Sequence, residues 1–397
     1  MIIATLKEVK NNENRVALTP DGVKKLVTAG CDVIVQSTAG LGSGFTDAEY
    51  VKAGAKIEKD AETIVRKSDM IVKIKEPIKE EYHLLKHMTG KTLFTYLHLS
   101  GVDAQLTEKL LEYKVTAIAY ETVETPSTAA NTAKILKQGK LPLLAPMSQV
   151  AGVLACQYGA NFMQKKYGGR GVSLGHIDGA RSSLTVVVGG GFVGRTAMLT
   201  AGGMGGKVVL LDINPKVIAR AKKEAKSYLG AKLAKNVSCI VSNAKTLAEY
   251  VKKADLLIGA VLVPGARAPQ VVTEAMVKSM LTGAVVVDVS IDQGGCIWGS
   301  HVTSHDNPVF DLDGKIFCCI PNIPGQVAHQ STQALTSATI PYMVKMVKGG
   351  VVQSLKKDSG LLAGLNTYNG KITYKNVAKD LGLMEQYTEA MTALSQK

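Results

Sequence analysis

The chain has 397 residues, of which 46% are hydrophobic, and 47 lysines and arginines against 33 acidic residues give a formal net charge of +14. This length is too large for one comfortable hydrophobic core, so we expect two domains. No uninterrupted apolar run reaches the length of a membrane span, which argues against an integral membrane protein. The opening residues, MIIATLKEVK, carry lysines where a signal peptide needs its apolar stretch, so secretion is not expected.

The basic charge raises the hypothesis of a nucleic-acid partner, which the distribution of the lysines disfavours. They are spread along amphipathic helical patterns, as in 216–235, and no aromatic-interleaved basic strand or nucleic-acid motif accompanies them. The six cysteines show no metal-ligand spacing, and several fall in apolar segments. Reduced, buried thiols in a cytoplasmic protein are therefore expected, with no bound metal. The expected partners are small molecules, with no nucleic acid and no membrane.

The first part of the chain alternates short apolar strands with helical patterns, which is typical of parallel α/β sheets. A helix is predicted to begin at Thr19-Pro20-Asp21, with threonine as N-cap and proline in the first turn, and to end near Gly30. A long helix is predicted over 148–167, after Pro146. The predicted strands of this first block are 2–7, 32–36, 70–75, 93–98 and 115–120.

The middle of the chain predicts a second sheet, a Rossmann set of six strands. The helical stretch 331–350 follows too late to belong to this sheet and is expected to return to the first domain. The fold class predicted is α/β, with two Rossmann-like, doubly wound parallel-sheet lobes and a cleft between them. Residues 1–142 plus 328–397 would form one domain, and residues 143–327 a Rossmann domain inserted into it. The predicted strands of the second sheet are 184–188, 207–212, 238–241, 255–260, 284–289 and 315–319.

The segment VVVGGGFVG at 186–194 predicts a dinucleotide site. Gly189 permits the tight turn after the strand, Gly191 lets the backbone approach a pyrophosphate, and Gly194 packs the following helix on the strand. The N-terminus of that helix would then face the phosphates. The next strand, KVVLLD, ends in Asp212, where a ribose 2′-hydroxyl would be held. Because this carboxylate would repel a 2′-phosphate, NAD is favoured over NADP; the alternative is a structural glycine-rich turn.

Four ionisable residues follow predicted strands, at the edge where open α/β sheets collect ligands: Arg15, Lys75, His98 and Asp292. Each also has a plain structural interpretation, namely a solvated loop cation, one lysine among many, a core histidine and a turn-capping aspartate. Taken together they form a consistent site. Two cations can hold a carboxylate, and a histidine titrates near neutral pH. A second acid/base group would face it from the nucleotide domain.

At this point the chain resembles a known family. Its motifs look like the successive motifs of alanine dehydrogenase, over about the whole chain, and AVLVPGARAP followed by IDQGGC is more specific than the glycine turn. The motifs that carry the resemblance are NNENRVALTP, AGLGSGF, VKIKEP, LFTYLHL, LPLLAPMSQVAG, GGRGVSLG, AVLVPGARAP, VVDVSIDQGGC, HDNPVF and GLNTYNGKITYKNVA.

The resemblance implies reversible, NAD-dependent oxidative deamination of L-alanine to pyruvate and ammonium, in a homo-hexamer. It implies that Arg15 and Lys75 bind the substrate and that His98 and Asp292 are the catalytic acid/base pair. The cofactor contacts that it implies are Ser148, Gly189, Gly191, Phe192, Val193, Gly194, Asp212, Val261, Leu262, Ile291, Asp292, Asn322 and Ile323.

Three other functions stay open at this point. The NAD-binding component of a nicotinamide nucleotide transhydrogenase shares the architecture but needs no amino-acid pocket. Related reductases that act on lysine or ornithine adducts share the two lobes. A non-enzymatic nucleotide sensor would keep the glycine turn and lose the acid/base pair. The segment 124–140 is longer than the usual connection in the family, and its role is open.

Overall fold

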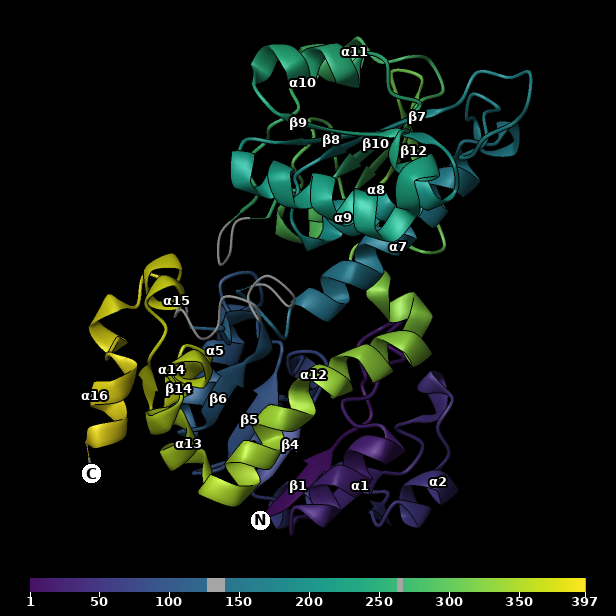
Figure 1. The fold of residues 1–397 in the computed structure, drawn as a ribbon. Helices are drawn as coiled ribbons and strands as arrows, with labels where there is room; N and C mark the ends of the chain where they lie inside the picture. The colour runs from purple at the N-terminus through teal and green to yellow at the C-terminus, as the bar shows by residue number, and fades with distance from the viewer. Residues whose placement is uncertain (127–139, 263–266, 397) are drawn as a thin grey trace. The chain divides into compact units, whose positions relative to one another are not determined.

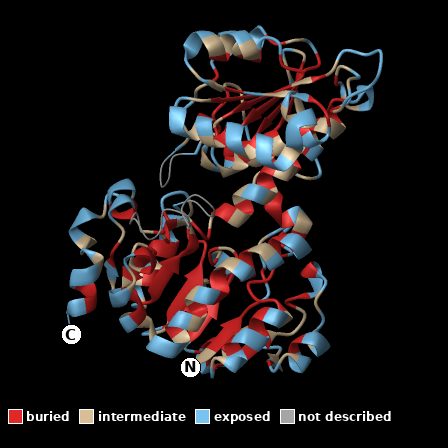
Figure 2. Ribbon diagram, viewed as in Figure 1, coloured by how far each residue is buried: buried red, intermediate tan, exposed pale blue. Residues whose placement is uncertain are grey.

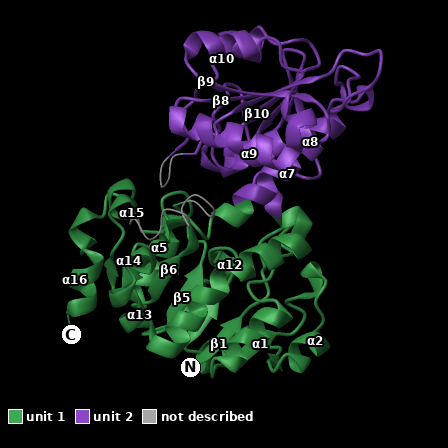
Figure 3. Cartoon of the chain, viewed as in Figure 1, with its two compact units in different colours: residues 1–147, 325–397 green, residues 148–324 purple. Residues whose placement is uncertain are grey.

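The structure, a computed structural model, describes residues 1–126, 140–262 and 267–396. The chain forms two compact units, Met1–Met147 with Gly325–Lys397 (unit 1) and Ser148–Pro324 (unit 2), which Figure 3 distinguishes by colour. Most of the extended 124–140 segment and part of the AVLVPGARAP motif lie outside the described residues. Within the described ranges, no helix is both long and apolar enough to cross a bilayer.

Unit 1 is built on an eight-stranded sheet in the order β15-β14-β6-β5-β4-β1-β2-β3 (Figure 1). The first six strands along the chain are parallel, and β1 pairs with both β2 and β4, so the strand order reverses beside β1. The last two strands extend the sheet in antiparallel fashion. The strands are β1 (Ile2–Thr5), β2 (Asp32–Gln36), β3 (Lys56–Glu58), β4 (Met70–Val72), β5 (Thr92–Thr95), β6 (Thr116–Ala119), β14 (Leu365–Tyr368) and β15 (Lys371–Ile372).

The helices of unit 1 begin where their capping residues predict. Helix α1 starts at Pro20, and Thr19 Oγ1 accepts the backbone N–H of Gly22 at 3.0 Å. Helix α12 packs closely on α1, since a Cβ on Gly22 would lie 2.7 Å from Thr336 Cγ2. The α-helices are α1 (Pro20–Thr28), α2 (Asp47–Lys52), α3 (Ala61–Lys67), α4 (Tyr82–Leu85), α5 (Ala104–Glu112), α12 (Ala328–Gly349), α13 (Val351–Lys357), α14 (Ser359–Leu362), α15 (Lys375–Asp380) and α16 (Ala390–Ser395). The 3-10 helices are η1 (Leu41–Ser43), η2 (Lys79–Glu81), η3 (Tyr120–Thr122) and η8 (Met384–Gln386).

Unit 2 is built on a seven-stranded sheet in the order β12-β13-β11-β10-β7-β8-β9. Six of its strands are parallel and follow the order of the doubly wound dinucleotide-binding fold. The antiparallel edge strand β12 was not predicted. The strands are β7 (Leu184–Val188), β8 (Lys207–Asp212), β9 (Val237–Val241), β10 (Leu256–Gly259), β11 (Val285–Asp288), β12 (Phe310–Leu312) and β13 (Lys315–Cys318).

The long helix before unit 2's sheet begins earlier than predicted. Helix α7 starts at Ala145 instead of residue 148, because Pro146 is tolerated in the first turn, where its missing N–H has no helical partner. It ends at Phe162 and is followed by a separate 3-10 turn, η5 (Lys165–Tyr167). The remaining helices of this part are α8 (Phe192–Gly203), α9 (Pro215–Ala234), α10 (Ala244–Val251), α11 (Glu274–Lys278), η6 (Val289–Gln293) and η7 (Ile323–Val327).

Burial divides each unit into a buried sheet and helices that expose their outer faces (Figure 2). The central strands β5, β6, β10 and β11 are buried at every residue. Continuous apolar runs of this kind are typical of parallel strands covered on both faces. The prediction of an α/β fold with two doubly wound lobes is confirmed, with the addition that both sheets are mixed rather than purely parallel.

Candidate functional site

Three of the predicted site residues of unit 1 follow adjacent strands of its sheet. Arg15 follows β1, Lys75 follows β4 and His98 follows β5, and these strands are neighbours in the order β5-β4-β1. The carboxyl ends of parallel strands lie at one edge, and a crevice forms where the strand order reverses. The sequence thus brings two cations and one imidazole to the ligand-binding edge of this sheet.

Arg15 is a buried residue rather than a solvated loop cation. Its guanidinium is paired with Glu13, with Nε at 2.7 Å from Oε1 and Nη2 at 2.5 Å from Oε2, while Nη1 lies 3.0 Å from Met147 Sδ. Burial alone would lower the pKa of Arg15, but the hydrogen bonds and charge of Glu13 outweigh it and raise that pKa. Glu13, which we did not predict, therefore fixes the plane of the guanidinium. Breaking a buried ion pair of this kind by removing one partner typically costs about 3–5 kcal/mol.

His98 is held in a strained and exposed position at the end of the β5 segment. Its φ is +47°, in the left-handed region, and its side chain is 42% exposed. The carboxylate of Glu121 accepts the backbone N–H of His98 at 2.6 Å and lies 3.8 Å from Nδ1. The ring stacks on Tyr96, with an interplanar angle of 4°. Backbone strain of about 1–3 kcal/mol is typical of functional sites, so this geometry favours a catalytic role over a core histidine.

Tyr96 links the histidine to the arginine. Its hydroxyl donates to the carbonyl of Leu143 at 2.7 Å, and the side chain is buried. Burial raises the pKa of the Tyr96 hydroxyl, while the charge of Arg15 acts in the opposite direction. Tyr96 and Glu121 were not predicted, although Glu121 follows β6 and so obeys the same strand-end rule as the others.

Lys75 is half-buried, and its backbone is tied to the neighbouring strand. Thr95 Oγ1, at the end of β5, donates a hydrogen bond of 3.0 Å to the carbonyl of Lys75. The strand before Lys75, β4, lies between β1, which precedes Arg15, and β5, which precedes His98.

The glycine turn of unit 2 has the geometry that a dinucleotide site requires. Gly189 has a φ of +102°, which a larger residue would adopt with strain. A Cβ on Gly194 would collide with the carbonyl of Gly189, whereas a Cβ on Gly191 would meet no described atom within 4 Å. Helix α8 begins after Gly191 without a side-chain cap, so its first N–H groups are suited to phosphate oxygens. The turn therefore fits a pyrophosphate.

Asp212 ends β8 and is oriented by two backbone donors. Its Oδ2 accepts the N–H of Gly190 at 2.7 Å, and its Oδ1 accepts the N–H of Asn214 at 2.7 Å. Each carboxylate oxygen has two lone pairs, so both can also accept from ribose hydroxyls.

Phe192, a predicted cofactor contact, is flanked by two guanidinium groups that we did not predict. Arg195 and Arg220 lie 4.9 and 5.7 Å from its ring centroid, and both pair with Glu224. Arg195 Nη1 also donates to the carbonyl of Gly190 at 2.6 Å. Arg195 thus fixes the backbone of the glycine turn. Val193, another predicted cofactor contact, is half-buried.

Asp292 and Asn322 are brought together at the ends of neighbouring strands. Asp292 is exposed on η6, after β11, and its Oδ1 accepts the backbone N–H of Asn322 at 3.1 Å. Asn322 follows β13 and has a φ of +53°. A capping aspartate and a catalytic one are both compatible with this contact, but the exposure leaves the carboxylate within reach of a ligand.

Four of the remaining predicted cofactor contacts, Val261, Leu262, Ile291 and Ile323, follow strands of unit 2's sheet, and the fifth, Ser148, lies on α7. Ser290 donates to the carbonyl of Val261 at 2.8 Å, which ties the end of the β10 segment to η6. Leu262 is 49% exposed, whereas Ile291 and Ile323 are buried. Ser148 lies half-buried in α7.

Asp288, which we did not predict, organises the loop that carries Asp292. It is fully buried at the end of β11 and accepts the backbone N–H groups of Ser290, Cys296 and Ile297 and the hydroxyl of Ser300 at 2.8–3.0 Å. Burial raises its pKa despite these hydrogen bonds. It therefore acts as a structural cap of the IDQGGC loop.

Metal ligation finds no support in the part of the chain that the structure describes, where no cluster of His, Cys, Asp and Glu side chains could hold an ion. All six cysteines are buried as free thiols.

Comparison with known proteins identifies the family of this chain. The profile "Alanine dehydrogenase/PNT, N-terminal domain" matches residues 4–151, and "Alanine dehydrogenase/PNT, C-terminal domain" matches residues 155–375. The chain belongs to the alanine dehydrogenase/PNT family. The family and the Rossmann-type fold imply a nicotinamide cofactor. The predicted resemblance is thus confirmed.

Individual relatives match over their whole length. The chain is 47% identical to the alanine dehydrogenase of Methanococcus maripaludis over 100% of both chains, and 44% identical to that of Bacillus subtilis over 99% and 98%. A solved L-alanine dehydrogenase superposes with a TM-score of 0.86 at 41% identity, covering 96% of this chain and 99% of the other. A transhydrogenase from Sinorhizobium meliloti superposes with a TM-score of 0.76 at 25% identity, covering 94% and 99%.

The glycine turn generates a direct test. Gly194→Ala should weaken NADH binding at least tenfold and destabilise the fold by about 1–3 kcal/mol, because the new Cβ overlaps the Gly189 carbonyl and pushes α8 off the strand. Fluorescence titration with NADH and urea unfolding measure the two effects. Gly203→Ala, in the same helix but with its Cβ 3.8 Å from Leu229, is the matched control and should bind normally. Normal NADH binding by Gly194→Ala would contradict the proposed turn.

Proposed function

We propose that this chain catalyses the reversible, NAD-dependent oxidative deamination of L-alanine to pyruvate and ammonium. The observation that carries the proposal is that each unit supplies a different part of the proposed site. Unit 1 presents Arg15, Lys75 and His98 at one sheet edge, and unit 2 carries a dinucleotide turn. Two cations suit the carboxylate that alanine and pyruvate share.

The relatives support this reaction over the alternatives. The full-length relatives named alanine dehydrogenase are 44–47% identical, whereas the solved transhydrogenase is 25% identical. The lysine and histidine of unit 1 stand at strand ends beside a buried arginine, as an amino-acid pocket requires. The NAD-binding component of a transhydrogenase needs no amino-acid pocket and therefore does not require Arg15, Lys75 and His98 at one sheet edge. Reductases acting on lysine or ornithine adducts are distinguished by their amine, which the assay below varies.

The chemistry needs a carboxylate anchor, a hydride acceptor and two proton-handling groups. Arg15 and Lys75 would hold the substrate carboxylate. The glycine turn and Asp212 would hold the nicotinamide cofactor, which when bound would supply the hydride acceptor for deamination and the hydride donor for amination. His98 and Asp292 would move protons at the substrate oxygen, the attacking water and the departing amine. Water adds to the iminium carbon, and ammonia leaves from the resulting carbinolamine; which of the two residues serves which proton is left open.

NAD is proposed as the cofactor because Asp212 presents a fixed negative charge at the end of β8. A 2′-phosphate there would face this carboxylate at close range, whereas a ribose hydroxyl can donate to it. The contacts proposed for NAD are those named from the sequence, from Ser148 to Ile323. A cytoplasmic homo-hexamer stays a prediction from the resemblance and from the reduced thiols.

The assay of the proposed function is oxidation of NADH with pyruvate and ammonium. Turnover should require both, and replacing ammonium by lysine or ornithine should abolish it. The loss of NADH absorbance follows the reaction. Turnover with lysine or ornithine, or none with ammonium, would contradict the proposal.

The acid/base pair is tested by His98→Ala and Asp292→Asn. Each variant should lower kcat about 10²-fold or more, the scale of general acid–base catalysis, and should still bind NADH. In His98→Ala, which alters no proposed NAD contact, the Kd for NADH should stay within about threefold. Steady-state kinetics and NADH titration measure the two quantities. Near-normal turnover would return that residue to a structural role, as a surface histidine or a turn-capping aspartate.

Cofactor choice is tested by Asp212→Asn. The amide keeps an oxygen that can accept from the Gly190 N–H but removes the charge, so the preference for NADH over NADPH should fall at least tenfold. The ratio of kcat/KM for the two cofactors is the measurement. A wild-type protein that uses both equally, or a variant with an unchanged ratio, would show that Asp212 does not set the choice.

A further inference from the structure

Three charged side chains of unit 1 are buried near the strand-end loops and take no part in the chemistry above. Lys73 Nζ lies 3.0 Å from Glu8 Oε2 and 2.7 Å from Glu81 Oε1. The side chains of all three are at most 9% exposed. Lys73 follows β4, Glu8 lies on the connection after β1, and Glu81 ends η2. We call these residues the Lys73 cluster.

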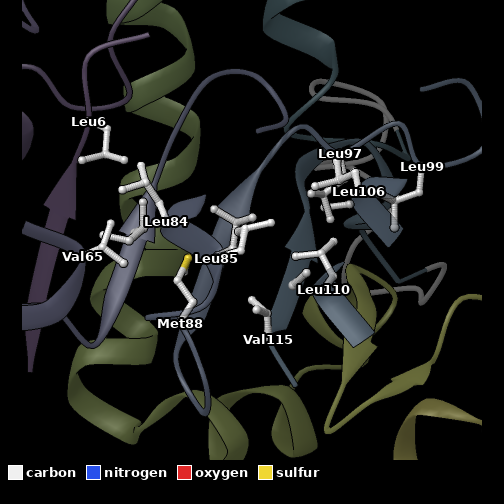
Figure 4. Packing of buried hydrophobic residues seen from close by; sticks show 14 of the residues in the cluster. Leu6, Val65, Leu84, Leu85, Met88, Leu97, Leu99, Leu106, Leu110 and Val115 are labelled. Carbon is white, nitrogen blue, oxygen red and sulfur yellow. The ribbon is translucent and has the colours of Figure 1, made fainter. Parts of the chain in front are cut away.

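The Lys73 cluster lies against an apolar wall. A small cavity lined by Lys73 and Glu81 is otherwise bounded by apolar residues, five of which are labelled in Figure 4. Burying an ion in such surroundings costs several kcal/mol. Burial alone would lower the pKa of Lys73, but the two carboxylates outweigh it and raise that pKa. The apolar lining residues are Leu6, Val65, Ile71, Pro77, Leu84, Leu85, Met88 and Leu93.

Stability is a weak explanation for this arrangement. Replacing buried ion pairs by neutral side chains of similar volume is often neutral or stabilising. One ammonium also faces two carboxylates here, and burial raises the pKa of Glu8 despite the charge of Lys73. A buried cluster of this kind gives a defined geometry more readily than it gives stability.

The geometry it defines is that of the turn that carries Lys75. Glu8 Oε1 accepts the backbone N–H of Ile74 at 2.7 Å, immediately before Lys75. Glu81 Oε2 accepts the backbone N–H of Ile78 at 3.2 Å, three residues after it. Lys73 joins the two carboxylates, so the turn 74–78 is tied at both ends to one ammonium group.

The same cluster reaches the loop that carries Arg15. Glu8 belongs to the connection between β1 and α1, which also contains Arg15, and its charge contributes to the raised pKa of that arginine. Lys10, on the same connection, pairs with Glu76 inside the turn at 2.5 Å. Both loops of the proposed carboxylate anchor are therefore fixed to one another by the buried Glu8 and by the partly exposed Lys10–Glu76 pair.

We propose that Lys73, through Glu8 and Glu81, is a positioning residue that sets the relative placement of Lys75 and the Arg15 loop for the substrate carboxylate. The inference rests on the proposed function. Since a displacement of about 1 Å can cost two orders of magnitude in rate, a loosened turn should weaken pyruvate use strongly. NADH binding should not change, because the cofactor contacts proposed above lie elsewhere.

The experiment uses a neutral cluster so that no charge is left buried without a partner. The triple variant Glu8→Gln/Lys73→Met/Glu81→Gln keeps an acceptor oxygen for each backbone N–H and removes the ammonium that joins them. The matched control is Lys109→Met/Glu112→Gln, which makes the same chemical changes to an exposed ion pair on α5. Circular dichroism establishes folding; NADH titration and steady-state kinetics with pyruvate follow.

The expected result is a KM for pyruvate raised at least tenfold, with the Kd for NADH within twofold of wild type and an unchanged control. An unchanged KM for pyruvate in the folded triple variant would overturn the inference. So would a KM for pyruvate and a Kd for NADH that rise by the same factor. If the triple variant does not fold, the single variant Glu81→Gln replaces it, because this change leaves Lys73 paired with Glu8. Its KM for pyruvate should rise at least threefold, and an unchanged KM would overturn the inference. A wild-type protein without turnover would instead contradict the proposed function.

Discussion

Both sheets share one topological constraint, on which the positions of Arg15, Lys75 and the glycine turn depend. In each unit the fourth strand along the chain pairs with the first, so the strand order reverses between them. Loops that leave the carboxyl ends of these two strands diverge, and ligands bind in the space that they leave. In unit 1 this point carries Arg15 and Lys75; in unit 2 it carries the glycine turn.

Buried carboxylates hold these strand-end loops in place. Glu13 orients Arg15, Glu121 holds the strained backbone of His98, and Asp288 gathers four donors beneath the loop of Asp292. None of these acids needs to touch a ligand to matter. Because the loops have little regular hydrogen bonding of their own, side-chain acceptors replace the missing backbone partners. The positions of the proposed reactive groups are thus set by neighbouring carboxylates that hydrogen-bond to their side chains or loops.

The sequence predicts the parallel strands well and the edges poorly. The bounds of β2, β7 and β8 agree with the predicted ranges, because each is an apolar run bounded by turn signals. The edge strands β3 and β12 are three residues long and contain charged residues, so they show no clear periodicity. The pairing of β14 with β6, which lies far earlier in the chain, is one that a local pattern cannot reveal. The hairpin of β14 and β15 across Asn369-Gly370 does carry a local signal, which we missed. The site follows the same division. Strand-end positions such as Arg15 and Glu121 can be recognised in the sequence, whereas the hydrogen bond between Glu121 and His98 depends on the pairing of β5 with β6.

The central claim is that the substrate carboxylate binds at the strand reversal of unit 1. A crystal structure of the protein with NADH and oxamate, a non-reactive analogue of pyruvate, tests it directly. The account predicts the oxamate carboxylate within hydrogen-bond distance of the Arg15 guanidinium and the Lys75 ammonium. Oxamate bound in this complex without a contact to either cation would contradict it.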